Sequence, residues 1–176
     1  MRDLGAVLVD HAHCEMKAAS NAMSLVVRHP QSLRLVRELT ELAREELDHF
    51  LQVLALLSAR GVPFRRLHPA PYGARLHEAV RKPDPGHLLD TLLVCALIEA
   101  RSCERMTLLA EHLPDPEIAG LYRGLLACEA RHFHSYVEMA TALFPRDEVR
   151  ARLQQLSAHE ARVLEQPCAE LRLHSS

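Results

Sequence analysis

Two Glu-x-x-His steps, Glu46–His49 and Glu129–His132, are the residues whose types and spacing point most directly to chemistry. Residues three apart lie on one face of a helix, so the carboxylate and the imidazole of each step can bind one metal ion side by side. In a chain with 12 His and many Glu, about one such step is expected by chance. The steps therefore predict a metal site only if their surroundings support one.

The surroundings of the two steps match each other. Each step is followed by Phe, and each has a lone Glu far upstream: Glu46 follows Glu15 by 31 residues, and Glu129 follows Glu99 by 30. Two consecutive antiparallel helices place positions about 30 apart at one level. Carboxylates with some imidazole suit iron or manganese. The pattern predicts a two-metal site with six ligands: Glu15, Glu46, His49, Glu99, Glu129 and His132.

Glu99 is the lone Glu that the sequence supports best. It is the charged member of an otherwise apolar run, residues 92–100, where a carboxylate is costly unless it is paired or bound to a metal. Two rivals stay open. Glu104 competes with Glu99 but breaks the symmetry of the spacing, and His11, one turn before Glu15, competes as a ligand or serves as an outer-shell or surface residue.

The elements that would position these residues are helices, because apolar residues recur at helical spacing and no strand pattern competes. His29-Pro30 ends the first helix, Ser32 caps the second, and Pro and Gly interrupt residues 62–86. The expected helices cover residues 4–28, 32–60, 87–112, 116–144 and 147–165, with a short one at 74–81.

This order is a helix pair, a long connection, a second helix pair and one further helix. It is the order of the ferritin-like four-helix bundle with one long crossover, here with an additional C-terminal helix. We therefore expect an all-α single domain over residues 1–176, with 62–86 as the crossover linker and 167–176 as a flexible tail.

Composition narrows the class of protein. Hydrophobic residues make up 48% and charged residues 25%, and the net charge of −2 gives no overall bias toward nucleic acid. The five Cys are odd in number and form no C-x-x-C, which indicates free thiols in a reducing cytoplasm. No apolar run is long enough to predict a membrane span.

Four segments of the chain resemble the MiaE-type tRNA hydroxylases. They are residues 10–25, Ala43–Phe50, Ile98–Arg105 and Glu129–Phe133. The resemblance implies a non-haem di-iron monooxygenase that hydroxylates the isopentenyl group of 2-methylthio-isopentenyladenosine in tRNA, beside the anticodon. It also implies two iron ions, O2 as co-substrate, and electrons from a reductase or ferredoxin system. The family's ligands fall on the same six residues that the spacing selects.

Further roles follow from related di-iron oxygenases and from charge. In those enzymes the residue before each Glu-x-x-His can support the opposite histidine, which implies that Glu45 supports His132, whereas Cys128 suits that role poorly. Cys103 would line the oxygen pocket or serve as a plain core residue. Residues 60–82 form a basic stretch with a net charge of +5, which could contact tRNA phosphates or be an ordinary solvated loop. The cations of this stretch are Arg60, Arg65, Arg66, Arg75, Arg81 and Lys82.

Two other functions stay open at the level of sequence. A ferritin- or rubrerythrin-like protein that handles iron or reduces peroxide would use the same ligands but load more metal. A metal-free helical interaction module would bind neither iron nor manganese.

Overall fold

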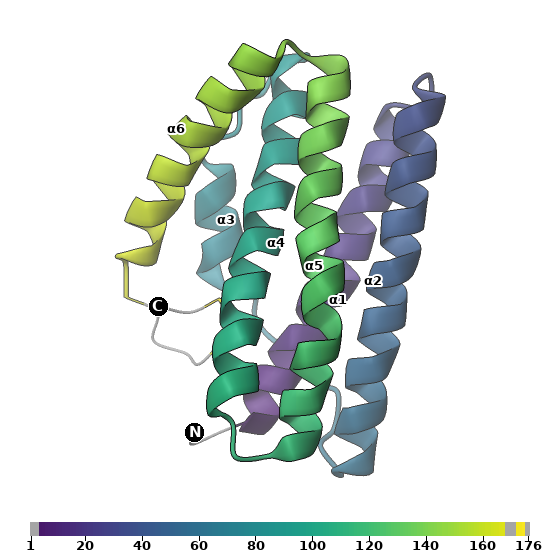
Figure 1. The fold of residues 1–176 in the computed structure, drawn as a ribbon, viewed down its shortest axis with the longest axis vertical. Helices are drawn as coiled ribbons and strands as arrows, with labels where there is room; N and C mark the ends of the chain where they lie inside the picture. Colours follow the sequence, from purple (N-terminus) through teal and green to yellow (C-terminus); the bar gives the residue numbers. More distant parts are fainter. Residues whose placement is uncertain (1–3, 168–171, 175–176) are drawn as a thin grey trace. The chain divides into compact units, whose positions relative to one another are not determined.

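The computed structural model describes residues 4–167 and 172–174. Within these residues the chain forms helices and no strand, as the sequence predicts. The helices are α1 (Leu4–Arg28), α2 (Leu33–Ala59), α3 (Pro71–His77), α4 (Gly86–His112), α5 (Pro116–Leu143) and α6 (Arg146–Leu164) (Figure 1).

The described residues divide into two compact units. The first contains the residues up to Pro69 together with Arg172 and Leu173, and the second contains the residues from Ala70 to Pro167 together with His174. The expected single domain stays a prediction, and each unit is described by itself.

The first unit is a hairpin of α1 and α2, which pack against each other and run in opposite directions (Figure 1). A tight turn joins them, in which the His29 N–H donates to the Leu25 carbonyl oxygen at 3.0 Å. On α2, the polar Glu46 and His49 lie in the same buried stripe as Leu39, Leu42 and Val53. The helical period therefore turns two of the predicted metal ligands toward an apolar interior.

Gly61 ends α2. Its φ of 64° is left-handed, a conformation that glycine adopts without steric cost, and the Val62 N–H donates back to the Leu57 carbonyl oxygen at 3.0 Å. Ser32 stands at the N-cap of α2 but forms no side-chain cap bond. The start of this helix is therefore placed by its apolar stripe rather than by a cap.

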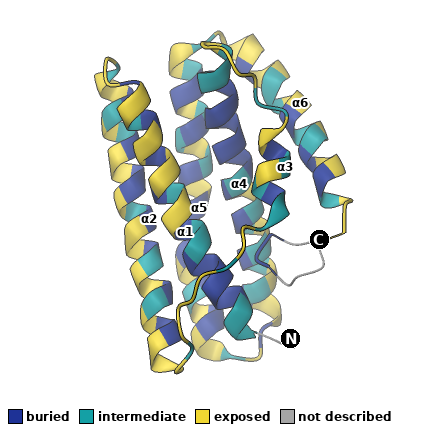
Figure 2. Ribbon diagram, turned by 180° about the vertical axis from the view of Figure 1, so that it is seen from behind, coloured by how far each residue is buried: buried dark blue, intermediate teal, exposed yellow. Residues whose placement is uncertain are grey.

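The second unit is built around α4. α5 packs along α4, and α3 and α6 also contact it. Residues Leu89–Leu97 of α4 are all buried, and Figure 2 shows this first half of the helix in dark blue. A helix that is apolar on every side is an interior helix. Asp115 starts α5 with a cap, since its carboxylate accepts hydrogen bonds from the Glu117 and Ile118 N–H groups at 3.1 and 3.2 Å.

The short helix of the connection lies earlier than the sequence predicts, at Pro71–His77 rather than 74–81. Pro71 supplies a favourable first position, and residues 78–80 continue only as single turns. Arg81 then leaves the helical path because its backbone N–H and its guanidinium donate to Asp90 on α4, at 2.7–3.0 Å. Arg152 of α6 donates to the same carboxylate at 2.7 and 2.8 Å.

Part of the expected flexible tail is packed. Arg172, Leu173 and His174 are buried, whereas residues 168–171 and 175–176 lie outside the described part of the chain. In the first unit, Arg172 Nη1 and the Leu173 N–H donate to the two oxygens of Asp10, at 3.3 and 2.9 Å. In the second unit, His174 stacks on Tyr72 with a centroid distance of 5.2 Å.

Candidate metal centre

The first unit brings together three of the six predicted ligands, here called the first triad: Glu15 of α1, with Glu46 and His49 of α2. One ligand atom from each lies within 4.8 Å of the others. All three side chains are buried, with residue exposures of 4%, 1% and 6%. His49 Nδ1 is 3.5 Å from Glu15 Oε2 and 4.0 Å from Glu46 Oε2.

His11 contacts the other oxygen of Glu15. Its Nε2 lies 2.5 Å from Glu15 Oε1, and the imidazole is fully buried. The surface position considered for His11 is therefore wrong; the residue contacts the carboxylate of a predicted ligand. Burial by itself raises the pKa of Glu15, but the interactions with His11 and with the two α2 residues hold it well below its usual range. Glu15 is therefore an anion at neutral pH.

The second unit brings together the other three predicted ligands, the second triad: Glu99 of α4, with Glu129 and His132 of α5. One ligand atom from each lies within 4.8 Å of the others, and the residues are 4%, 2% and 2% exposed. The i to i+3 spacing puts Glu129 and His132 on one face of α5, and the packing of α5 on α4 brings Glu99 to them.

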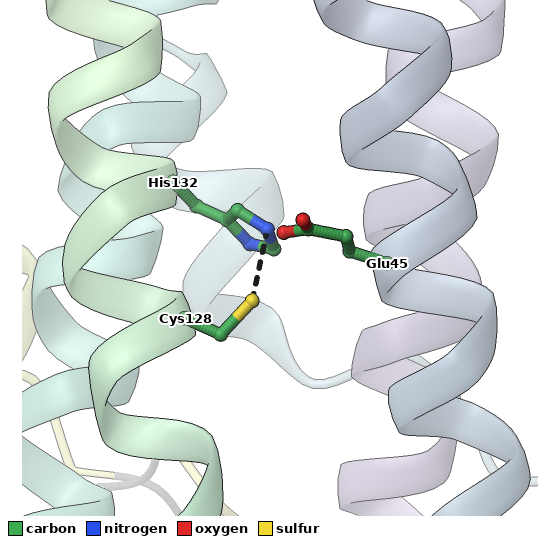
Figure 3. Close-up of side chains that lie close together, drawn as sticks. All are labelled: Glu45, Cys128 and His132. Carbon is green, nitrogen blue, oxygen red and sulfur yellow. Dashed lines mark hydrogen bonds between the residues drawn. The ribbon is translucent and has the colours of Figure 1, made fainter.

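Cys128 touches His132 on the same helix. The Sγ atom lies 3.4 Å from His132 Nε2, as the dashed line in Figure 3 shows, and Arg131 Nη2 donates to that sulfur at 3.1 Å. From the sequence, Cys128 was considered only as a possible support for the opposite histidine, His49, and its contact with His132 was not predicted. The i to i+4 spacing of Cys128 and His132 was the available signal.

The burial of side chains along α4 decides between Glu99 and Glu104, the two candidate ligands on that helix. Glu104 has a side chain that is 52% exposed and forms an ion pair with Arg101, whereas Glu99 is buried. Arg101 also donates to Glu160 at 3.2 Å. Glu104 and Arg101 thus form a pair at the outside of the helix, and the symmetric choice of Glu99 agrees with the burial.

Cys103 lies one turn after Glu99 and is half-buried. Burial, and next the negative charge of Glu129, raise the pKa of the Cys103 thiol. The residue is therefore a neutral, weakly polar side chain close to the second triad, and its role as a pocket residue stays a prediction. Glu45 is half-buried on α2, and its support of His132 also stays a prediction.

The donor set of each triad fits a divalent metal ion. Two buried carboxylates within 4.8 Å of each other repel strongly at low dielectric, and a cation between them removes that cost. Two carboxylates with one imidazole are ligands typical of iron and manganese and contain no thiolate. The chemistry of the side chains therefore supports metal binding in both units.

The predicted tRNA contacts differ in their surroundings. Arg60, Arg65, Arg66 and Lys82 are exposed, and Arg75 is half-buried. Arg81 is engaged with Asp90, so its charge is already matched by a buried carboxylate. A phosphate contact by Arg81 would compete with this ion pair.

Among the described residues, no helix combines the length and the low charge that crossing a lipid bilayer requires.

The family model described as tRNA-(MS2IO6A)-hydroxylase (MiaE) matches residues 1–175 of the chain. A tRNA 2-(methylsulfanyl)-N(6)-isopentenyladenosine(37) hydroxylase of Pseudomonas putida is 42% identical over 175 residues, which cover 99% of this chain and 85% of that protein. The hydroxylase of the same name from Salmonella typhimurium is 29% identical over 221 residues, which cover 99% of this chain and 81% of that protein.

A solved structure is also similar over most of the chain. It is described as protein 43 with aldehyde deformylating oxygenase activity from Synechococcus, and it is 47% identical with a TM-score of 0.94. The similarity covers 97% of this chain and 87% of that chain. The likeness confirms the expected fold class, an all-α helical bundle of the ferritin-like kind.

Proposed function

We propose, since this chain belongs to the MiaE family of tRNA hydroxylases, that it hydroxylates the isopentenyl group of 2-methylthio-isopentenyladenosine in tRNA next to the anticodon. The observation that carries the proposal is the family match over residues 1–175, which includes both triads. The substrate named for the relative at 42% identity is the second support.

We propose that the two triads hold two iron ions. The ligands would be Glu15, Glu46, His49, Glu99, Glu129 and His132. When bound, the irons would supply the activation of O2 that C–H hydroxylation requires. The support is the repeated pattern, in which each unit buries one upstream Glu beside one Glu-x-x-His step.

The protein's own side chains have distinct tasks in this proposal. Because His11 holds Oε1 of Glu15, Oε2 is the oxygen that would bind iron beside His49. Cys128 fixes the ring of His132 from one side. Buried apolar residues on the same helices, such as Leu42 four residues before Glu46 and Leu92 seven residues before Glu99, would keep water from the reacting group.

The reaction needs an external electron donor to balance. One methyl C–H bond is broken and one C–O bond is formed, while O2, two electrons and two protons yield the alcohol and one water. A reductase or ferredoxin system is the proposed source of the electrons. A tRNA substrate would place the enzyme in the cytoplasm.

The test is mass analysis of nucleosides after the iron-loaded protein has been incubated with reductant, O2 and tRNA that carries 2-methylthio-isopentenyladenosine. We expect that nucleoside to gain one oxygen atom, with the label retained when 18O2 is used. Unchanged nucleoside in the presence of stoichiometric bound iron would contradict the proposal. Iron loading far beyond two per chain would instead favour the iron-handling function.

A second candidate is oxygen-dependent deformylation of an aldehyde, because the similar solved structure is described as having that activity. The same iron-loaded protein would be incubated with a long-chain aldehyde, and formate and alkane would be measured. Formate release without any change in tRNA would favour this second function over the first.

A further inference from the structure

A cluster of three aromatic rings forms on the first unit where the connection leaves α2. Phe64 lies with its ring centroid 4.7 Å from that of His13 on α1 and 5.6 Å from that of Phe50 on α2. His13 Nε2 also donates to the carbonyl oxygen of Arg65 at 2.8 Å. The connection is therefore fastened to both helices of the hairpin at Phe64 and Arg65.

Phe64 is more exposed than any other Phe or Tyr side chain of the described residues, since the other three Phe are half-buried. The chain has four Phe, three Tyr and no Trp, and all three Tyr are buried. Phe64, at 38% exposure, is the one aromatic ring among the exposed large apolar side chains of the described residues. The ring packs against His13 of α1 and Phe50 of α2, so its position is fixed while part of it stays exposed to solvent.

The charge around Phe64 is of one sign. Arg65 and Arg66 follow it directly and are exposed, and the sequence has no Asp or Glu between Asp48 and Glu78. Figure 2 shows the connection between α2 and α3 in yellow over much of its length. A fixed aromatic ring beside two cations is the combination that binds an unpaired base and its phosphates.

We propose that Phe64, supported by His13 and Phe50, is a stacking platform for an unpaired base of the tRNA anticodon loop, with Arg65 and Arg66 on the neighbouring phosphates. This inference rests on the proposed function and assigns it a binding surface. The platform stands at the level of the first triad, because His13 lies two residues before Glu15 and Phe50 directly follows His49. A base flanking the modified adenosine is the occupant that this position fits.

The test is fluorescence anisotropy of a labelled synthetic anticodon stem-loop that carries 2-methylthio-isopentenyladenosine, titrated with the iron-loaded protein. Phe64→Ala and Phe64→Leu should each weaken binding about tenfold, because stacking on the ring is lost. Phe64→Tyr should bind as the wild type does. Leu33→Ala removes an apolar side chain of the same unit that is even more exposed, 70% against 38% for Phe64, and it should leave the Kd unchanged.

The comparison of Phe64→Leu with Phe64→Tyr decides the case even if Phe64→Ala fails to fold, because both keep a large apolar side chain and only Tyr keeps the aromatic ring. Equal binding by these two variants would overturn the platform. If the wild type hydroxylates the stem-loop while the variants bind normally, the proposed function stands and the platform fails. If the wild type binds the stem-loop but never hydroxylates it, the proposed function fails instead.

The contribution of Arg65 and Arg66 is tested separately, through the salt dependence of the Kd. Replacing both Arg65 and Arg66 by Gln should reduce the slope of log Kd against log salt by about 1.4, the value for two contacts to single-stranded phosphates. Arg34→Gln is the matched control, since its guanidinium donates to Glu38 at 2.7 Å in the same unit. An unchanged slope in the double variant would remove both arginines from the interface.

Discussion

Glu15 shows how a helix pair can keep a buried carboxylate charged. His11 binds one of its oxygens at 2.5 Å and His49 approaches the other at 3.5 Å, so the anion is held from two sides. Without such partners, burial would favour the neutral acid. A carboxylate that is already ionised and oriented can bind a metal without first losing a proton.

The second triad gives the clearest prediction at the scale of single residues. Glu129→Ala or His132→Ala removes a buried ligand and should lower iron content and cut hydroxylation more than about 100-fold, since even outer-shell changes cost 10–100-fold. Metal analysis and circular dichroism would measure metal content and helicity. Glu104→Ala, which removes an exposed ion-paired carboxylate of α4, is the control and should keep both. Full iron loading in either ligand variant would refute the assignment.

At the scale of elements, the helices differ in whether a side chain caps their first turn. Asp115 caps α5 through two backbone N–H groups, whereas Ser32 at the start of α2 makes no such bond. The sequence predicted the cap at Ser32 and placed the start of α5 by Pro116 alone. A serine before a helix and an aspartate before Pro are both common starts, and only the local backbone decides which side chain can reach the N–H groups.

This difference predicts unequal costs for two similar substitutions. Asp115→Ala should lower the free energy of unfolding by about 1 kcal/mol, because two N–H groups at the start of α5 lose their acceptor. Ser32→Ala should change it by less than about 0.5 kcal/mol. Urea denaturation followed by circular dichroism measures both. Equal losses in the two variants would show that the cap contributes nothing.

The Asp90 carboxylate joins three elements of the second unit. It accepts from Arg81 in the connection and Arg152 in α6, and these interactions outweigh burial and lower its pKa to about 2. A shift of that size from 3.8 corresponds to about 2 kcal/mol of stability. Asp90→Asn should therefore cost about 2 kcal/mol at pH 7, measured by urea denaturation.

The pH dependence of the same variant follows from the direction of the shift. Because the pKa of Asp90 is lower in the folded state, its contribution is fully present above about pH 4 and is lost as pH falls through about 2. The gap in stability between wild type and Asp90→Asn should therefore narrow from pH 5 to pH 2. Asp147→Asn, at a side chain that is 93% exposed, should show no such gap at any pH.

The sequence reveals the long helices and selects the six residues of the two triads because both follow from patterns with a regular spacing. Leu39, Glu46 and His49 share one helical stripe, which periodicity alone can show. It does not reveal Asp90 with Arg152 or Asp10 with Arg172, which join residues far apart in the chain. The short helix lies earlier than predicted for the same reason, because Arg81 is held by its hydrogen bonds to Asp90 and does not continue the helix.

At the scale of the whole molecule, each unit contributes one triad of the same composition: two carboxylates and one imidazole. The sequence shows this equivalence as two copies of one pattern, a lone Glu followed after 31 or 30 residues by a Glu-x-x-His step. If the triads hold iron, as proposed, metal binding and folding are linked in each unit.

That linkage predicts how the protein responds to removal of the metal. With free iron at about 100 times its Kd, binding adds about 2.7 kcal/mol, so chelation should lower the Tm by roughly 5–10 °C in a chain of this size. Anaerobic calorimetry should show that unfolding of the iron-loaded protein moves to higher temperature as a whole, because each unit holds metal. Glu129→Ala should show a smaller shift, since its second triad is incomplete. A loaded wild type in which only part of the unfolding responds to the chelator would mean that only one of the triads holds metal.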